Sequence, residues 1–368
     1  MKNKIKDIEK YLPKDWKEKC KELKALSRGR EIKTAEELLT LNLMYLTIGG
    51  SFGTTAALIN MTTDKKMSKK AVYTRIQNSG EWLKWMSKKM GEENGMLIPK
   101  PEWLTKNIKL VDGSELSVKG SQKGDYMLHY AFNPFEFTST FKITDMSTGE
   151  SLVNYELSED DIVIGDRGYV SIKGMEYALS CEADFILRYR NKAFNLYDSE
   201  RNKIDLLEVL NECHLGSLES ASFDYFYISK GKMKPVRIVA IRKTPEAEKE
   251  SMRKIKRKHS RNQLKAPSSQ TLEMNKYIIL ATSLDRTTYS NEKISELYRA
   301  RWQIEQVFYR LKSLFNLGEI PCKKEESVKA WFYGKLFLAI LAETIIKVES
   351  FSPEEETGMS FDFVKSLE

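Results

Sequence analysis

The sequence predicts a mixed α/β fold preceded by an all-α N-terminal domain. Three observations support this fold class. The first hundred residues carry apolar side chains at helical spacing, with recognisable helix starts. From residue 108 onward, aromatic and β-branched runs bounded by turn residues predict strands. A long amphipathic helix follows the last predicted strand, over Tyr298–Lys312.

The composition is that of a globular protein with room for two or three domains. The chain has 368 residues, of which 41% are hydrophobic and 11% aromatic, enough to bury a large core. No apolar run reaches the length of a membrane span, and the N-terminus lacks the apolar stretch of a signal peptide. The formal charge of +8 is compatible with nucleic acid as a partner but does not prove it.

Cysteine and histidine are too scattered for a metal site built from them. The four cysteines include no CxxC pair, which argues against a disulfide framework and favours the reducing cytoplasm as the location. If a metal is used, carboxylates are therefore the expected ligands, which points to Mg²⁺ or Mn²⁺. The residues concerned are Cys20, Cys181, Cys213, Cys322, His129, His214 and His259.

The N-terminal segment predicts successive helices. Thr34 begins a capping-box pattern before an apolar run, and a short helix is expected over 54–60. A polar turn and a basic helix after Ser68 complete the outline of a helix-turn-helix, whose last helix would enter the major groove. An ordinary helical subdomain explains the pattern equally well. The expected DNA contacts are Lys69, Lys70, Arg75 and Gln77.

Strands dominate the next part of the chain. The first three are expected to form an antiparallel meander. The segment 161–169 contains a continuous apolar run, as expected of a central strand covered on both faces. A strongly apolar helix over 328–348 is expected to pack in the core. The predicted strands are 108–116, 126–133, 135–146, 161–169, 183–190 and 276–284.

A basic run lies between the last two of these strands. Residues 253–265 hold seven Lys or Arg and no acid. A solvated helix face or loop and a segment that tracks phosphates explain this run equally well.

The helix after the last strand carries an unusual set of side chains. Tyr298, Arg301, Glu305 and Lys312 have the spacing Y-x2-R-x3-E-x6-K, and at about 100° per residue they share one edge of the helix. A row of paired surface charges would give part of this pattern. A carboxylate between two cations and an aromatic ring also suits a metal-dependent enzyme that acts on phosphates.

Two further acids occupy positions that suit metal ligands. Asp112 follows the apolar run IKLV, and Asp166 directly follows IVIG, at the edge where α/β sheets carry active sites. Taken singly, each is better explained as a turn former or helix cap. Together with Glu305 they provide the three carboxylates that a two-metal phosphoryl-transfer site needs.

These motifs resemble those of the DDE transposases of the insertion sequence 4 family. Tyr298, Arg301, Glu305 and Lys312 match its YREK signature. VDGSEL around Asp112 and IGDRGY around residue 166 look like its first and second aspartate motifs. The similarity runs from about residue 105 to residue 345.

The resemblance implies a ribonuclease-H-like catalytic core with a mostly β insertion. It divides the chain into a helical DNA-binding domain over 1–100, a catalytic domain over 105–191 and 276–350, and the insertion over 192–275. A polar tail, 351–368, follows. Asp112, Asp166 and Glu305 would be the catalytic residues and metal ligands, for two Mg²⁺ or Mn²⁺ ions.

The resemblance also implies the reaction and its partners. The enzyme would cut element ends to free a 3′-OH, pass through a DNA hairpin and join the end to target DNA. Tyr298, Arg301 and Lys312 would hold phosphate near the transposon end. Tyr277 is the nearest aromatic to the position where relatives stack a flipped base, although a core tyrosine explains it better.

The expected partners are double-stranded DNA, at terminal inverted repeats and target sites, and a second copy of the chain, because two ends must be cut and joined together. No membrane is involved, and the enzyme would act in the bacterial cytoplasm, on the nucleoid. Two alternatives remain open. One is a non-transposing ribonuclease-H-like nuclease, and the other is a domesticated DNA-binding protein.

Overall fold

The computed structural model describes residues 2–27, 30–48, 50–93, 100–118, 121, 124–136, 138–191, 193–261, 267–301, 319–320 and 324–350. The chain forms two compact units, which are described separately. The first combines Met1–Met96 with Arg310–Glu368, and the second is Leu97–Tyr309.

The first unit is built from helices. They are α1 (Lys2–Glu9), α2 (Trp16–Glu22), α3 (Ala35–Thr47), α4 (Phe52–Thr62), α5 (Lys69–Asn78), α6 (Gly80–Glu93) and α13 (Glu325–Ser350), with the two-residue strand β9 (Glu319–Ile320) before α13. The predicted helix starts are confirmed: the Thr34 hydroxyl accepts from the Glu37 amide, and the Ser68 hydroxyl accepts from the Ala71 amide. Each cap satisfies a backbone donor that the helix itself cannot.

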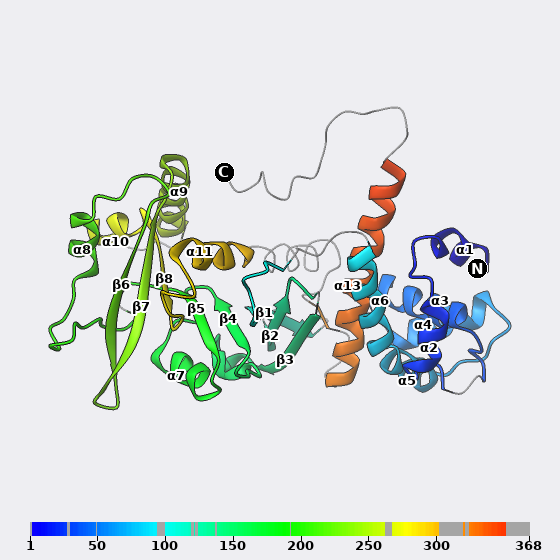
Figure 1. The fold of residues 1–368 in the computed structure, drawn as a ribbon. Coiled ribbons are helices and arrows are strands. Elements are labelled where there is room, and N and C mark those ends of the chain that lie inside the picture. Colours follow the sequence, from blue (N-terminus) through cyan, green and yellow to red (C-terminus); the bar gives the residue numbers. More distant parts are fainter. Residues whose placement is uncertain are drawn as a thin grey trace. The chain divides into compact units, whose positions relative to one another are not determined.

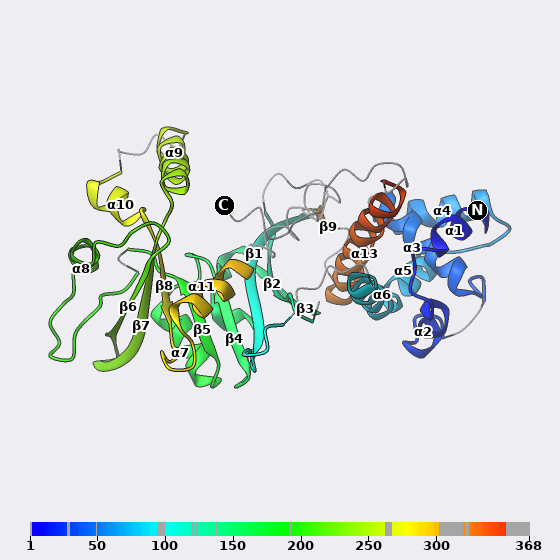
Figure 2. The same ribbon diagram turned by 45° about the horizontal axis from the view of Figure 1, so that its top comes forward.

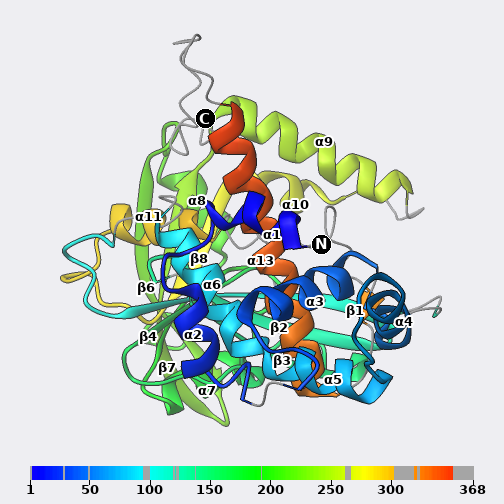
Figure 3. The same cartoon turned by 90° about the vertical axis from the view of Figure 1, so that its right-hand side faces the viewer.

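Helix α13 packs against α6, α5 and α3 (Figure 3). The approach to α6 is close, since a Cβ on Gly80 would lie 3.5 Å from Cα of Ala330. Lys335 donates to the carbonyl of Leu46, 2.9 Å away. This apolar helix was expected to pack in a core, which is confirmed, but it was predicted to belong to the catalytic domain. Its contacts place it with the N-terminal helices instead.

The second unit is organised around one mixed sheet (Figure 1). Its strands lie in the order β3-β2-β1-β4-β5-β8-β7-β6. Strands β1, β2 and β3 form the predicted antiparallel meander, and β4 and β5 run parallel to β1. The strands are β1 (Asn107–Val118), β2 (Tyr126–Asn133), β3 (Thr138–Asp145), β4 (Asp161–Gly165), β5 (Asp184–Arg188), β6 (Ser220–Ser229), β7 (Lys232–Arg242) and β8 (Tyr277–Thr282).

The segment predicted as a mostly β insertion, 192–275, is mixed. It supplies the hairpin β6–β7 and also α8 (Leu206–Glu212), α9 (Pro245–Arg261) and α10 (Ser269–Met274). Strand β8 pairs antiparallel with β5 on one side and with β7 on the other. The hairpin therefore extends the main sheet.

The two faces of the sheet differ in their cover. On one face, α7 (Ile172–Ser180) packs over a cluster that includes Val111, Val163 and Phe185. This is the α7 face. Side chains alternate along a strand, so the residues before and after Val111, Val163 and Phe185 point to the opposite face. We call this opposite face the α11 face. There α11 (Asn291–Ala300) contacts β6 and β7.

A buried arginine fastens α11 to this face. Arg237 of β7 is 5% exposed, and its guanidinium donates to the Tyr289 carbonyl at 2.6 Å and to Asn291 Oδ1 at 2.6 Å. The start of α11 is thereby held over the same face on which the candidate site lies. The short helices η1 (Met146–Thr148) and η2 (Leu152–Asn154) complete the unit.

Candidate functional site

The parallel pairing of β1 with β4 relates the two predicted aspartates. In the parallel pair β1–β4, Leu110 lies opposite Ile164. Continuing this register by two residues brings Asp112 opposite Asp166, on the α11 face. Asp166 directly follows β4, as predicted. Asp112 lies inside β1, paired with Tyr130 of β2, so it does not begin a turn.

Two buried tyrosines fix the backbone around these aspartates. The Tyr155 hydroxyl donates to the carbonyl of Asp112 at 2.9 Å and lies 2.8 Å from the Tyr169 hydroxyl. Since the proton of Tyr155 is used in the first bond, Tyr169 donates in the second. Burial raises the pKa of both hydroxyls, and the charges of Asp112 and Glu150 add to the effect. Both tyrosines therefore stay neutral and hold the site in place.

A third carboxylate near the aspartates was missed by the sequence analysis. The Glu150 side chain reaches between two glycines: a Cβ on Gly113 would lie 3.1 Å from its Cγ, and a Cβ on Gly168 would overlap its Oε2. Burial of the carboxyl, and then the charge of Asp166, raise the pKa of Glu150. No local pattern marks Glu150, because it lies in a loop that only the folded chain brings here.

A group of cations lies next to the aspartates on the same face. In the parallel pair β4–β5, Ile164 lies opposite Ile186, so Arg188 continues the row of Asp112 and Asp166. The Nε atom of Arg188 is buried and has no hydrogen-bond partner among the described residues. This arginine was also missed by the sequence analysis.

Arg167 and Lys243 complete this cation group. Burial, followed by the charge of Arg188, lowers the pKa of the Arg167 guanidinium. Burial, then Arg188 and Arg167, lower the pKa of Lys243 to about 8. Arg188 thus lowers the pKa of both other cations, and three cations close together form a site that suits an anion. We call Arg167, Arg188 and Lys243 the cation group.

Tyr298 and Arg301, at the end of α11, lie beside this group. Tyr298 is 7% exposed, and its hydroxyl has no hydrogen-bond partner among the described residues. It lies near enough to Arg167 to affect the pKa of that guanidinium. The guanidinium of Arg301 lies over the Tyr298 ring, 5.6 Å from the centroid. Glu305 and Lys312, the other two members of the spacing, lie outside the described residues.

The remaining predicted residues lie elsewhere. Lys69 and Lys70 are exposed on α5, whereas Arg75 is partly buried, and burial lowers its pKa. Tyr277 is 6% exposed in the cluster on the α7 face, the face away from the aspartates. This supports a core role for Tyr277.

The donor set suits a hard divalent cation. Carboxylate oxygens are the preferred ligands of Mg²⁺ and Mn²⁺, and Asp112 and Asp166 present such oxygens from neighbouring strands. Within the described ranges, no three His, Cys, Asp or Glu side chains converge as a complete ligand group.

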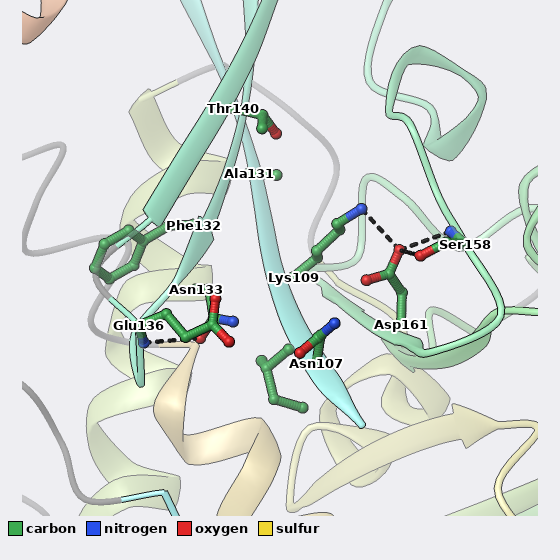
Figure 4. Close-up of a pocket in the computed structure, with 10 residues that line it drawn as sticks. Asn107, Lys109, Ala131, Phe132, Asn133, Glu136, Thr140, Ser158 and Asp161 are labelled. Atoms are coloured by element: carbon green, nitrogen blue, oxygen red, sulfur yellow. Dashed lines mark hydrogen bonds and ion pairs between the residues drawn. The ribbon is translucent and has the colours of Figure 1, made fainter. Parts of the chain in front are cut away.

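A hollow at the opposite end of β1 and β4 has a structural explanation (Figure 4). Asp161 accepts from Lys109 Nζ at 2.7 Å and from the amide and hydroxyl of Ser158 at 2.7 and 2.8 Å. Lys109 also donates to the Glu156 carbonyl. These groups satisfy one another, so the hollow is a poor candidate for the functional site.

Comparison with known proteins identifies similar chains. The family model described as "Transposase DDE domain" matches residues 103–341. The chain is 29% identical over 345 residues to the putative transposase InsL for insertion sequence element IS186A of Escherichia coli (strain K12), covering 91% of each chain.

Two further relatives show the same kind of similarity. The transposase for insertion sequence element IS421 of Escherichia coli is 29% identical over 346 residues, again covering 91% of each chain. The transposase for insertion sequence element IS231F of Bacillus thuringiensis subsp. israelensis is 26% identical over 206 residues, which cover 51% of this chain and 42% of the relative. In the part of the chain that the structure describes, no helix is long and apolar enough to cross a membrane.

Proposed function

The chain belongs to the Transposase DDE domain family, and from this premise we propose how its residues carry out DNA transposition for an insertion sequence of the insertion sequence 4 family, YREK group. Enzymes of this family cleave and join DNA with divalent metal ions. We assign strands β1 to β5 and α7 to a ribonuclease-H-like core. The observation that carries the assignment is the parallel pairing of β1 with β4 and of β4 with β5, whose register, continued by two residues, aligns Asp112, Asp166 and Arg188 on one face of the sheet.

Asp112, Asp166 and Glu305 are the proposed ligands of two Mg²⁺ or Mn²⁺ ions. When bound, such ions lower the pKa of the attacking oxygen and stabilise the charge of the leaving oxygen. Tyr155 and Tyr169 contribute by holding the backbone at Asp112. The backbone that carries the Asp112 carboxylate is thus held in place.

The cation group and α11 are proposed to hold the DNA phosphates. Arg188 Nε and the Tyr298 hydroxyl are both buried donors without partners among the described residues. Leaving such donors unpaired costs about 1–3 kcal/mol each, and a phosphate oxygen would remove that cost. Arg167, Arg301 and Lys312 would add charge to the same grip.

Each proposed step is an in-line displacement at phosphorus. Water attacks at the element end, the P–O3′ bond breaks, and the freed 3′-OH leaves. This 3′-OH attacks the opposite strand, forms a hairpin and releases the flanking DNA. Water then reopens the hairpin, and the same 3′-OH attacks target DNA and displaces a target 3′-OH. A proton passes from each attacking oxygen to solvent.

The N-terminal helices are proposed to recognise the element ends. Lys69 and Lys70 are exposed at the start of α5 and are free to meet phosphates, with the partly buried Arg75 as a further contact. Two copies of the chain would act together, because two ends must be cut and joined. We expect this to take place in the bacterial cytoplasm, on the nucleoid.

The test is to incubate the protein with Mg²⁺ and a duplex that carries its own element end. We expect Glu305→Ala to keep end binding in a mobility-shift assay and to lose nicking, because one metal ligand is gone. Glu296→Ala, an exposed acid on α11, is the matched control and should nick normally. If Glu305→Ala still nicks, Glu305 is not the third ligand.

A second observation separates a transposase from a non-transposing nuclease. Short inverted repeats that flank the gene and are bordered by a direct duplication indicate transposition. Cleavage of branched or hairpin DNA without such repeats would favour the nuclease instead.

A further inference from the structure

Helix α9 carries a row of cations that the proposed catalytic site does not use. Lys249, Arg253, Arg257 and Arg261 are spaced four residues apart along this 17-residue helix and are exposed. At 100° per residue the four lie within about 120° of arc, and they extend over about 18 Å. We call these four residues the α9 row.

The opposite side of α9 fastens the helix to the sheet. Glu248 accepts from Arg242 Nη2 at 3.2 Å. The hydroxyl of Ser251 is within 3.1 Å of Lys243 Nζ and accepts from Asn275 Nδ2 at 2.8 Å. These contacts fix which face of α9 points outward, and that outward face is the one that carries the row.

The charge of the row is largely uncompensated. Glu250 pairs with Arg253 at 2.8 Å, but no acid occurs from residue 251 to residue 272. Lys249, Arg257 and Arg261 have no ion pair within the described ranges. Cations in the last turn stabilise a helix through its dipole, which accounts for Arg261 but not for Lys249 or Arg253.

The row starts close to the candidate catalytic site. Lys243 belongs to the cation group and lies two residues before α9, at the end of β7. Figure 2 shows α9 standing beyond this end of β7, away from the β6–β7 turn. Positive charge therefore continues from the site along α9.

We propose that the α9 row binds the phosphate backbone of the duplex whose scissile strand lies at Asp112 and Asp166. This inference rests on the proposed function. A row of about 18 Å matches about five base-pair steps of a duplex, and its charge complements phosphate. A membrane surface fits poorly, because α9 offers few apolar side chains, and the largest, Met252 and Ile255, are partly buried.

The test compares two triple variants that remove the same charge. The row variant is Lys249→Gln, Arg257→Gln and Arg261→Gln. The control is Lys230→Gln, Lys232→Gln and Lys234→Gln, three exposed lysines at the far end of β7, roughly 30 Å away along the strand. Both sets are on the surface, so both proteins should keep the thermal stability of the wild type.

Fluorescence anisotropy without metal then measures affinity for the element-end duplex over a range of salt concentrations. For the row variant we expect an affinity at least about tenfold lower than that of the wild type. The slope of log affinity against log salt concentration should be smaller in magnitude by about 2 to 3, since each lost phosphate contact contributes about 0.9. The control variant should match the wild type. A shortened duplex that ends at the cleavage site lacks the flanking DNA. If the α9 row contacts that flanking DNA, wild type and row variant should differ less in their affinity for the shortened duplex.

Other outcomes overturn the inference. If the row variant and the wild type share one salt slope, α9 does not contact the duplex. If both variants lose affinity equally, net charge alone explains the loss. If the row variant binds DNA normally but loses binding to phosphatidylglycerol vesicles, the partner is a membrane. If wild-type protein binds no duplex at all, the proposed function itself fails.

Discussion

The two ends of the strand pair β1–β4 use the same kinds of side chain in opposite ways. At the amino end, Asp161 accepts hydrogen bonds from Lys109 and Ser158, and its side chain is 2% exposed. At the other end, Asp112 and Asp166 stand in one row with a third acid and a group of cations nearby. Acids and bases are adjacent in both places.

What differs between the two ends is whether the polar groups satisfy one another. A buried polar group that finds its partner within the chain contributes to stability, whereas one left without a partner costs free energy until something binds. The Lys109–Asp161 pair belongs to the first kind. Arg188 Nε and the Tyr298 hydroxyl belong to the second kind, since neither has a hydrogen-bond partner among the described residues. The comparison predicts that variants at the two ends fail in different ways.

The largest difference is expected between Asp166→Asn and Asp161→Asn. Losing a proposed metal ligand should reduce metal-dependent nicking at least about 10²–10³-fold, as removal of a group that stabilises charge in the transition state does. The free energy of unfolding of Asp166→Asn should barely differ from that of the wild type.

For Asp161→Asn we expect the reverse. Breaking the pair leaves Lys109 without its charge partner and should lower the free energy of unfolding by about 3 kcal/mol, with nicking per folded molecule retained. Urea unfolding and a gel assay at a temperature where both proteins are folded measure the two effects. If folded Asp161→Asn cannot nick, the distinction between the two ends is wrong.

A second variant sharpens the comparison by removing an unsatisfied donor. Arg188→Met should weaken binding of the element-end duplex about tenfold to a hundredfold, because a charge-assisted bond to phosphate is worth about 1.5–3 kcal/mol. Its unfolding free energy should stay equal or rise by up to about 1 kcal/mol, since the unpaired Nε is gone. Arg286→Met, which removes an exposed arginine paired with Asp224, is the control for net charge. A large loss of stability in Arg188→Met would show that Arg188 is structural.

Sequence patterns predicted the parts of this site that depend on neighbours in the chain. Asp166 could be found because it follows an apolar strand, and the Tyr298–Lys312 spacing because its four residues are close together in the chain. The α/β class, the meander and the buried central strand followed from residue types alone.

The remaining parts depend on strand register and tertiary contacts, which a local pattern does not contain. Arg188 joins the row only because β5 pairs with β4 in one particular register. Glu150 reaches the aspartates from a loop about 40 residues away from Asp112 along the chain. Helix α13 was recognised as apolar, but an apolar helix does not specify its partner, so its contacts with α6 were not predicted. Arg75 was predicted to contact DNA, yet tertiary packing partly buries it.

The smallest expected effect concerns Lys243, which combines features of both ends of the strand pair. Lys243 donates to Ser251 and Asn275, as a structural lysine does, yet burial and two arginines lower its pKa to about 8. A bound phosphate raises that pKa again, so the protein should take up part of a proton on binding DNA. Affinity should then fall as pH rises from about 7 to about 9, by at most about tenfold per unit. Anisotropy titrations check this, with Lys243→Met losing the dependence. If the affinity of the wild type and that of Lys243→Met change with pH in the same way, Lys243 is structural, like the Lys109–Asp161 pair, and does not contact the phosphate.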